Sequence, residues 1–171
     1  MDFEIANGFV KISGEPKDYF GTPAVERTFL SAAKRSAELY YSSATRPFLT
    51  PITIPLDTTV SVVSDKLLVA PRAAVLRKRL RRLIPFSFKN ALRYHEVTAP
   101  WAVCCSQSRV ERITLAEDET ATLDVSSLVA WSGNPPNGFI PRLSMCDIFI
   151  PKKVNLQLRF FGPAVIYFEG S

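Results

Sequence analysis

The sequence predicts a mainly β domain that carries one helix near its N-terminus. Thirteen Pro against only seven Gly, together with many Val, Thr and Phe, favour short strands joined by fixed turns. Apolar residues alternate or cluster in three blocks after residue 50, as strands do. With 171 residues, 47% of them hydrophobic, the chain is long enough for one domain with its own core and too apolar for a disordered tail.

Residues 1–50 are predicted to form an N-terminal extension. Thr22 and Pro23 supply a helix N-cap and a favoured first helical residue, and apolar side chains recur near helical spacing up to Tyr41. An amphipathic helix is therefore expected over about residues 22–41. The residues before it are expected to form one or two short strands among turn formers.

Residues 51–171 are predicted to form the β domain. Two of its blocks resemble each other in order, because an apolar strand, an acidic turn and a second strand ending in Leu-Val-Ala occur at 54–70 and again at 113–130. In this comparison of the two segments, Leu68 is aligned with Leu128. Such a unit cannot bury both of its faces alone, so stacking of the two copies is expected.

The positive charge is concentrated between these copies. The net charge is +5, yet nine Lys or Arg and no acid fall between Lys66 and Arg93, so the remainder carries a net charge of −4. Pro71 and Pro85 bracket a predicted short basic helix between the repeats. One broad face of this helix would carry Val75, Leu76, Leu80, Leu83 and Ile84.

This basic segment predicts a binding site for an anionic partner, either RNA or an anionic lipid surface. An RNA platform would also use nearby aromatic side chains, and Phe86, Phe88 and Tyr94 are close in sequence. The alternative is that the apolar residues are core and the arginines keep the helix soluble. The residues expected to bind the partner are Arg72, Arg77, Lys78, Arg79, Arg81, Arg82, Lys89 and Arg93.

Neither a catalytic site, a cofactor nor a metal is expected. His95 is the only histidine, and Ala99 stands where the second His of the zinc-protease helix motif would be. The three cysteines lack CxxC spacing and are expected to be buried thiols, and no Gly-rich phosphate loop occurs. An enzyme would need His95 in a pocket with a carboxylate or a Cys within hydrogen-bond reach. No apolar stretch reaches the length of a membrane span.

The order of features from about residue 52 to 168 resembles the altered inheritance of mitochondria protein twenty-four family. The phrase from Ser127 to Asn134 fits the family's Leu-Val-Ala-x-x-Gly strand ending. The basic stretch followed by Phe86-Ser87-Phe88, and the closing phrase from Phe160 to Phe168, are also similar to the family pattern. Pro163-Ala164 stands where the family has Gly, which indicates a divergent member.

This resemblance implies a β-sandwich or barrel of the tryptophan-RNA-attenuation-protein type, which builds threefold or larger assemblies, and a mitochondrial location. The N-terminus is acidic and shows no ordinary presequence, so a leader would have been removed or be internal. The expected function is that of a non-catalytic structural protein, a scaffold component or accessory subunit of a large complex, with protein partners and no small-molecule substrate. The alternatives are an RNA-binding accessory subunit of the mitochondrial ribosome and a peripheral inner-membrane organising protein. A homo- or hetero-oligomer is compatible with each of these functions.

Overall fold

A computed structural model of the chain confirms that the fold is mainly β. It describes residues 46, 48–71, 74–83, 91–139 and 156–170 with their side chains and, before residue 46, the backbones of five short strands. Every regular element in these parts of the chain is a strand. No helix that could cross a bilayer is found in them.

Two groups of six strands follow the N-terminal strands. The N-terminal strands are β1 (Phe3–Ala6), β2 (Phe9–Ser13), β3 (Tyr19–Gly21), β4 (Phe29–Ala33) and β5 (Ser36–Tyr40). The first group, called unit 1, contains β6 (Phe48–Thr53), β7 (Val60–Val63), β8 (Leu67–Pro71), β9 (Val75–Arg82), β10 (Ala91–Thr98) and β11 (Trp101–Ser106). Unit 2 contains β12 (Val110–Leu115), β13 (Thr120–Asp124), β14 (Leu128–Gly133), β15 (Asn137–Phe139), β16 (Gln157–Phe161) and β17 (Ala164–Glu169).

The strand pairings of unit 1 recur in unit 2. β11 pairs with β6 and β8, and β17 pairs in the same way with β12 and β14. β10 pairs with β7 and β9, and β16 pairs with β13 and β15. Even the register shift in β8·β11 has a counterpart in β14·β17. The predicted repetition is therefore a duplication of the whole six-stranded unit.

The register of this duplication differs by one residue from the predicted match of Leu68 with Leu128. The turn before β8 is closed by a hydrogen bond from the Lys66 amide, and the turn before β14 is closed in the same way by the Ser127 amide. The next residues therefore correspond, and Leu67 is the counterpart of Leu128. The sequence match aligned the two Leu-Val-Ala triplets, 68–70 and 128–130. Because β8 begins with two consecutive leucines, this alignment is shifted by one residue from the structural one.

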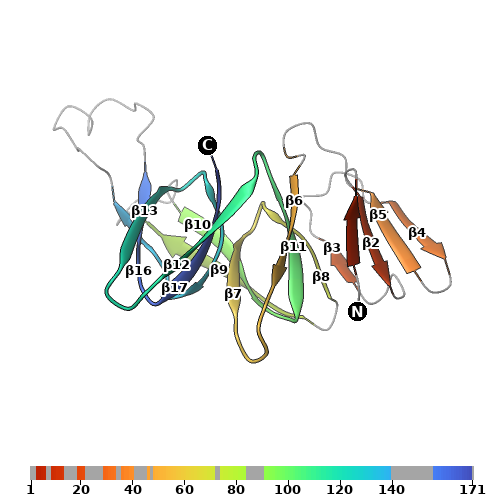
Figure 1. Ribbon diagram of the computed structural model, residues 1–171, viewed down its shortest axis with the longest axis horizontal. Helices are drawn as coiled ribbons and strands as arrows, with labels where there is room; N and C mark the ends of the chain where they lie inside the picture. The colour runs from red at the N-terminus through yellow and green to blue at the C-terminus, as the bar shows by residue number, and fades with distance from the viewer. Residues whose placement is uncertain are drawn as a thin grey trace.

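Strands from both units form the central sheet, whose order is β12-β17-β14-β7-β10-β9. The other sheets have the orders β3-β8-β11-β6, β13-β16-β15 and β1-β2-β5-β4. Figure 1 shows these sheets succeeding one another along the length of the molecule. Each sheet ends in two edge strands, so no barrel closes among the described strands, and the barrel form of the predicted fold is not found there.

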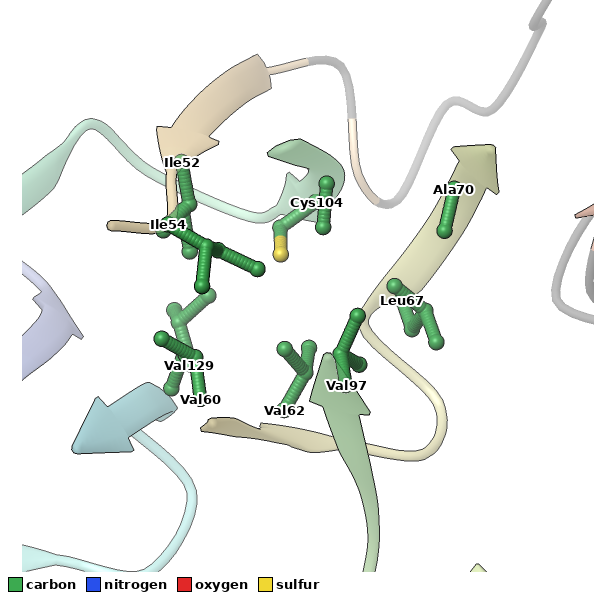
Figure 2. Close-up of a cluster of buried hydrophobic side chains, with 11 residues drawn as sticks. Ile52, Ile54, Val60, Val62, Leu67, Ala70, Val97, Cys104 and Val129 are labelled. Atoms are coloured by element: carbon green, nitrogen blue, oxygen red, sulfur yellow. The ribbon is translucent and has the colours of Figure 1, made fainter. Parts of the chain in front are cut away.

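Among the described residues, the core consists of two clusters, which lie on opposite faces of the central sheet. The first cluster joins β7, β10 and β14 of the central sheet to the sheet β3-β8-β11-β6. Figure 2 shows its side chains pointing toward one another. The second joins the central sheet to the three-stranded sheet and contains Trp131 and Phe160. Val62 and Val63 are neighbours on β7 but belong to different clusters, as the alternation of a strand requires. Each cluster contains residues of both units.

The basic segment forms a strand, so the prediction of a short basic helix between the repeats is wrong. Its apolar residues Leu76, Leu80 and Leu83 have a spacing that also fits a helix. However, β9 is hydrogen-bonded to β10 along its whole length, from Val75 opposite Thr98 to Arg82 opposite Ala91. This pairing outweighs the local pattern, because an isolated helix with so many like charges is destabilised by repulsion between its turns.

The predictions for the first 50 residues fall on a part of the chain that is described only in segments. Within the helix predicted over about residues 22–41, the structure describes two stretches, and both are strands (β4 and β5). Residues 22–28, 34, 35 and 41 of that prediction lie outside the described residues. β6 begins at Phe48, and the division of the chain at residue 50 stays a prediction.

Candidate anionic-partner interface

The eight predicted binding residues lie on two neighbouring strands or outside the described residues. Five of them are on β9, one is on β10, and two, Arg72 and Lys89, are not described. The residues on β9 are Arg77, Lys78, Arg79, Arg81 and Arg82, and the residue on β10 is Arg93. The structure therefore brings together six of the eight predicted residues.

β9 is one of the two edge strands of the central sheet, and β12 is the other. β9 pairs with β10 on one side, and no described strand pairs with its other side. An edge strand presents unpaired backbone groups that invite pairing with another chain, and lysines or arginines along it oppose such pairing. Placing five cations on these eight residues therefore has a structural reason as well as a functional one.

The cations of β9 divide between the two faces of the sheet, because successive side chains on a strand point to opposite sides. Arg77, Arg79 and Arg81 share one face, where two of them meet acceptors from the same molecule. Arg79 Nε donates to Glu96 Oε2 at 3.0 Å, and Arg81 Nη2 donates to Asn137 Oδ1 at 3.1 Å. This face is thus partly neutralised by the protein itself.

The opposite face carries an exposed leucine among cations, and we call it the Leu80 face. It consists of Lys78, Leu80 and Arg82 on β9 and Arg93 on β10, which lies directly opposite Leu80. Leu80 is 57% exposed, and the three cations are also exposed. Among the described residues, no carboxylate forms an ion pair with Lys78 or Arg93. This face combines positive charge with an apolar side chain.

Lys66 does not belong to this surface, although it belongs to the basic run of the sequence. Its side chain is buried and its ammonium lies 2.6 Å from Glu169 Oε1, with a second hydrogen bond to the Ser126 carbonyl at 2.7 Å. Lys66 belongs to unit 1 and both partners to unit 2. The pair therefore joins the two units and is not available to a partner.

His95 is on β10 directly opposite Lys78, on the same side of the sheet as the Leu80 face. It is only 7% exposed, and its Nδ1 atom is buried without a hydrogen-bond partner. Burial of the imidazole, and secondarily the charge of Lys78 opposite it on β9, lower the pKa of His95 from its usual value. The surroundings of His95 thus favour a neutral ring. The carboxylate or thiol partner that the enzyme alternative requires is not found beside Nδ1 among the described residues.

The aromatic platform predicted for RNA is not available at Tyr94. This side chain is buried on the other face of β10, and its ring lies 4.8 Å from that of Trp131, centroid to centroid. Phe86 and Phe88 lie outside the described residues.

The other chemically interesting residues of the sequence are buried or isolated. Cys104 and Cys105 are buried free thiols, and burial raises the pKa of Cys104 well above its usual value. Cys146 lies outside the described residues. The acidic turn at residues 117–119 is exposed, and no group of three potential metal ligands occurs in the described part of the chain.

A streptococcal protein has this fold. The chain matches protein SPYM3_0169 of Streptococcus pyogenes, known from a crystal structure, with a TM-score of 0.69. The match covers 99% of this chain and 92% of that chain at 14% sequence identity, so the likeness establishes the fold alone. No protein-family model matches the chain, and no curated protein matches its sequence.

Sequence reasoning found the cations of the site but missed its apolar residue. Leu80 is assigned to the core face of a helix by its spacing from Leu76 and Leu83, whereas the strand exposes it. The residues of β9 show no apolar–polar alternation with the period of a strand, so the sequence carries no local signal that Leu80 is exposed.

Proposed function

We propose that the protein is a non-catalytic assembly protein that docks on an anionic lipid surface through its Leu80 face. The observation that supports this proposal is the exposure of Leu80 between Lys78 and Arg82, opposite Arg93. Cations attract lipid phosphates, and an apolar side chain among them gains by entering the acyl boundary. An interface with RNA phosphates would give that leucine no comparable role.

The expected attraction is modest and sensitive to salt. Each Lys or Arg close to an anionic membrane contributes about 1 kcal/mol, and complete burial of a leucine contributes about 1.5–3 kcal/mol. Three cations and one leucine therefore give weak, reversible binding by a single chain. An assembly of several chains would bind more strongly, because its copies engage the surface together.

We also propose, on the resemblance described above, that the protein is a divergent member of the altered inheritance of mitochondria protein twenty-four family. A mitochondrial location and a role as a scaffold component or accessory subunit follow as part of this proposal. The β fold is compatible with it. Fractionation of cells that express the tagged chain is the direct measurement of location.

The experiment for lipid binding compares two variants with equal loss of charge. Lys78→Gln, Arg82→Gln and Arg93→Gln together remove the cations of the Leu80 face. Binding to cardiolipin-rich vesicles in a flotation assay should fall at least tenfold, and a fourth change, Leu80→Ser, should lower it further. The control removes three exposed cations elsewhere, Arg109, Arg112 and Arg159, each replaced by Gln.

The control variant should retain vesicle binding, whereas equal losses in both variants would contradict a specific face. Vesicles without anionic lipid should bind neither protein. Thermal unfolding of each variant should show that the fold is preserved, because all the changed side chains are exposed. Failure of the unchanged protein to float with anionic vesicles at low salt would reject the lipid proposal.

RNA is the second candidate, because an exposed cationic edge also suits a phosphate backbone. On the Leu80 face, Lys78 and Arg82 are four residues apart on β9, about 13 Å, and together with Arg93 they can follow an extended polyanion. In this case, binding to single-stranded RNA should fall steeply with salt, and the Gln variant of the Leu80 face should flatten that dependence. Leu80→Ser should leave RNA binding unchanged, which separates the two candidates.

A further inference from the structure

The way in which units 1 and 2 are joined shows which strand edge the fold uses for docking. β7 of unit 1 pairs with β14 of unit 2, with Val62 opposite Ala130 and Ser61 opposite Trp131. β13 is the counterpart of β7 in unit 2. β7 pairs with β10, β13 pairs with β16, and β10 and β16 are themselves counterparts. The other edge of β13 has no strand beside it among the described residues.

The side chains of β13 follow the same plan as those of β7. The turn correspondence matches Ala121 with Val60 and Leu123 with Val62, so both strands direct two apolar side chains toward the core. Between them stands a hydroxyl residue in each case, Ser61 or Thr122. The burial of the strands differs: three of the four residues of β7 are buried, whereas those of β13 alternate between exposed and half-buried. β13 thus resembles β7 without the strand of a following unit that β7 pairs with.

A groove borders β13: it is lined by residues 122–124 of this strand, by residues of β16 and β17, and by loop residues. The groove of unit 2 has a volume of about 510 Å³, and Asp124 and Gln157 are among the residues that line it. Their counterparts in unit 1 are Val63 and Tyr94, which pack in one cluster with Trp131 of β14. The same position is therefore filled by the next unit in one copy and open in the other.

The N-terminal strands repeat the docking pattern in shortened form. β5 pairs with β2 and β4, as β11 pairs with β6 and β8. β3 pairs with β8, as β7 pairs with β14. β4 (Phe29–Ala33) therefore corresponds to β8 and β14, the strands that dock on the edge of a preceding unit. Among the described strands, β4 has a partner on one side only.

We propose that the edge of β13 receives β4 of a second copy of this chain. β4 corresponds to β8 and β14, which pair with β3 and β7 of the preceding units, and its outer edge is unpaired among the described strands. β13 corresponds to β7, and its outer edge is also unpaired there. A pairing of β4 with β13 would therefore repeat the pairings β3·β8 and β7·β14. Figure 1 places β4 and β13 at opposite ends of the molecule, so the two edges of one chain do not meet. Two copies can satisfy both edges of each other and close a dimer.

The sequence of β13 agrees with an edge that is meant to pair. It contains no lysine, arginine or proline, the residues that usually protect an exposed edge strand. β9, an edge strand of the central sheet, carries five cations. The cations of β9 therefore oppose pairing with another chain, whereas β13 carries no cation or proline that would oppose it. The polar lining of the groove indicates a joint held mainly by backbone hydrogen bonds rather than by a large apolar contact.

Disulfide trapping tests which strand occupies the groove. Thr122 and Ser31 stand in the middle of β13 and β4, and both are changed to Cys in a chain that also carries Cys146→Ser, while the buried Cys104 and Cys105 are retained. Oxidation should give a covalent dimer on a non-reducing gel. A disulfide within one chain would overturn the proposal in favour of closure by the chain's own N-terminal strands. Absence of any disulfide would reject β4 as the occupant.

The matched control for trapping replaces Thr114 of β12, another exposed threonine on an edge strand, and combines it with Ser31→Cys. Equal dimer yields from the two pairs would overturn the proposal, because the contact would not be specific for β13. Light scattering gives an independent measurement. The unchanged chain should be dimeric, and Thr122→Lys should weaken the dimer at least tenfold while Thr114→Lys leaves it intact. A monomeric unchanged chain, or a dimer insensitive to Thr122→Lys, would contradict the proposal.

Discussion

At the scale of the residue, His95 combines a buried ring with an unpartnered nitrogen. His95 lies opposite Lys78 on the neighbouring strand, and burial of the ring and this ammonium both favour the neutral form. In the unfolded chain the histidine is solvated and accepts a proton near its usual pKa of about 6.5. The unfolded state therefore binds more protons than the folded state as the pH falls below that value. By linkage, the free energy of unfolding must decrease in the same range.

We predict that acidification from pH 7.5 to 5.5 lowers the free energy of unfolding by an amount that depends on His95. A single histidine contributes a slope of at most about 1.4 kcal/mol per pH unit, starting below about pH 6.5 and ending at the lowered pKa. In urea titrations, His95→Gln should remove this slope, and Lys78→Gln should reduce it. A slope unchanged in His95→Gln would show that other groups cause the pH dependence.

At the scale of the element, the sequence predicted most strands of the two units but not β9. β7, β8 and β14 are readable because β-branched and apolar residues cluster between turn formers. β9 has no local feature that excludes a helix, since Leu76, Leu80 and Leu83 share a helical face. Its conformation is decided by hydrogen bonds to β10, a strand later in the chain. Pairing of this kind is outside the reach of a periodicity argument.

The charges of β9 are predicted to prevent its free edge from pairing with other chains. Arg77 and Arg79 lie on the face opposite Leu80. Replacing both by Thr keeps a good strand former and removes the repulsion, so the protein should self-associate at concentrations where the unchanged chain is stable in solution. Light scattering measures this, and far-ultraviolet circular dichroism should show unchanged β content.

The matched control for this edge replaces Arg159 of β16 and Arg109 by Thr, since both are exposed and neither is on an edge strand. This variant has the same net charge as the β9 variant. Self-association of both variants to the same degree would indicate a general effect of net charge. Self-association of the β9 variant alone would assign the protection to the edge strand.

At the scale of the whole molecule, the sequence revealed only half of the duplication. The first three strands of each unit keep similar lengths and turns, so their likeness is visible in the letters. The later strands have diverged: β9 has eight residues, and its counterpart β15 has three. Their equivalence appears only from the pairings with β10 and β16. The joint between β7 and β14 rests on two residue pairs, a feature too small to leave a sequence pattern.

The shared core predicts that units 1 and 2 unfold together. Each hydrophobic cluster contains side chains of both units, and the buried pair of Lys66 with Glu169 crosses between them. Neither unit can lose its packing without exposing apolar surface of the other, so an intermediate with one folded unit would carry a large free-energy cost. The two tryptophans report on different places, because Trp101 is buried in unit 1, whereas Trp131 is buried in unit 2 at its contact with Tyr94 of unit 1.

Two single-tryptophan variants measure this coupling. Trp101→Phe leaves the reporter of unit 2, and Trp131→Phe leaves the reporter of unit 1. Each variant will have its own stability, so the comparison is made within a variant: the urea midpoint from fluorescence should equal the midpoint from circular dichroism. A fluorescence midpoint that differs from the circular dichroism midpoint in either variant would mean that the units unfold independently. Coincidence in both variants would mean that the duplicated units act as one cooperative structure, since each reporter then follows the loss of both sheets.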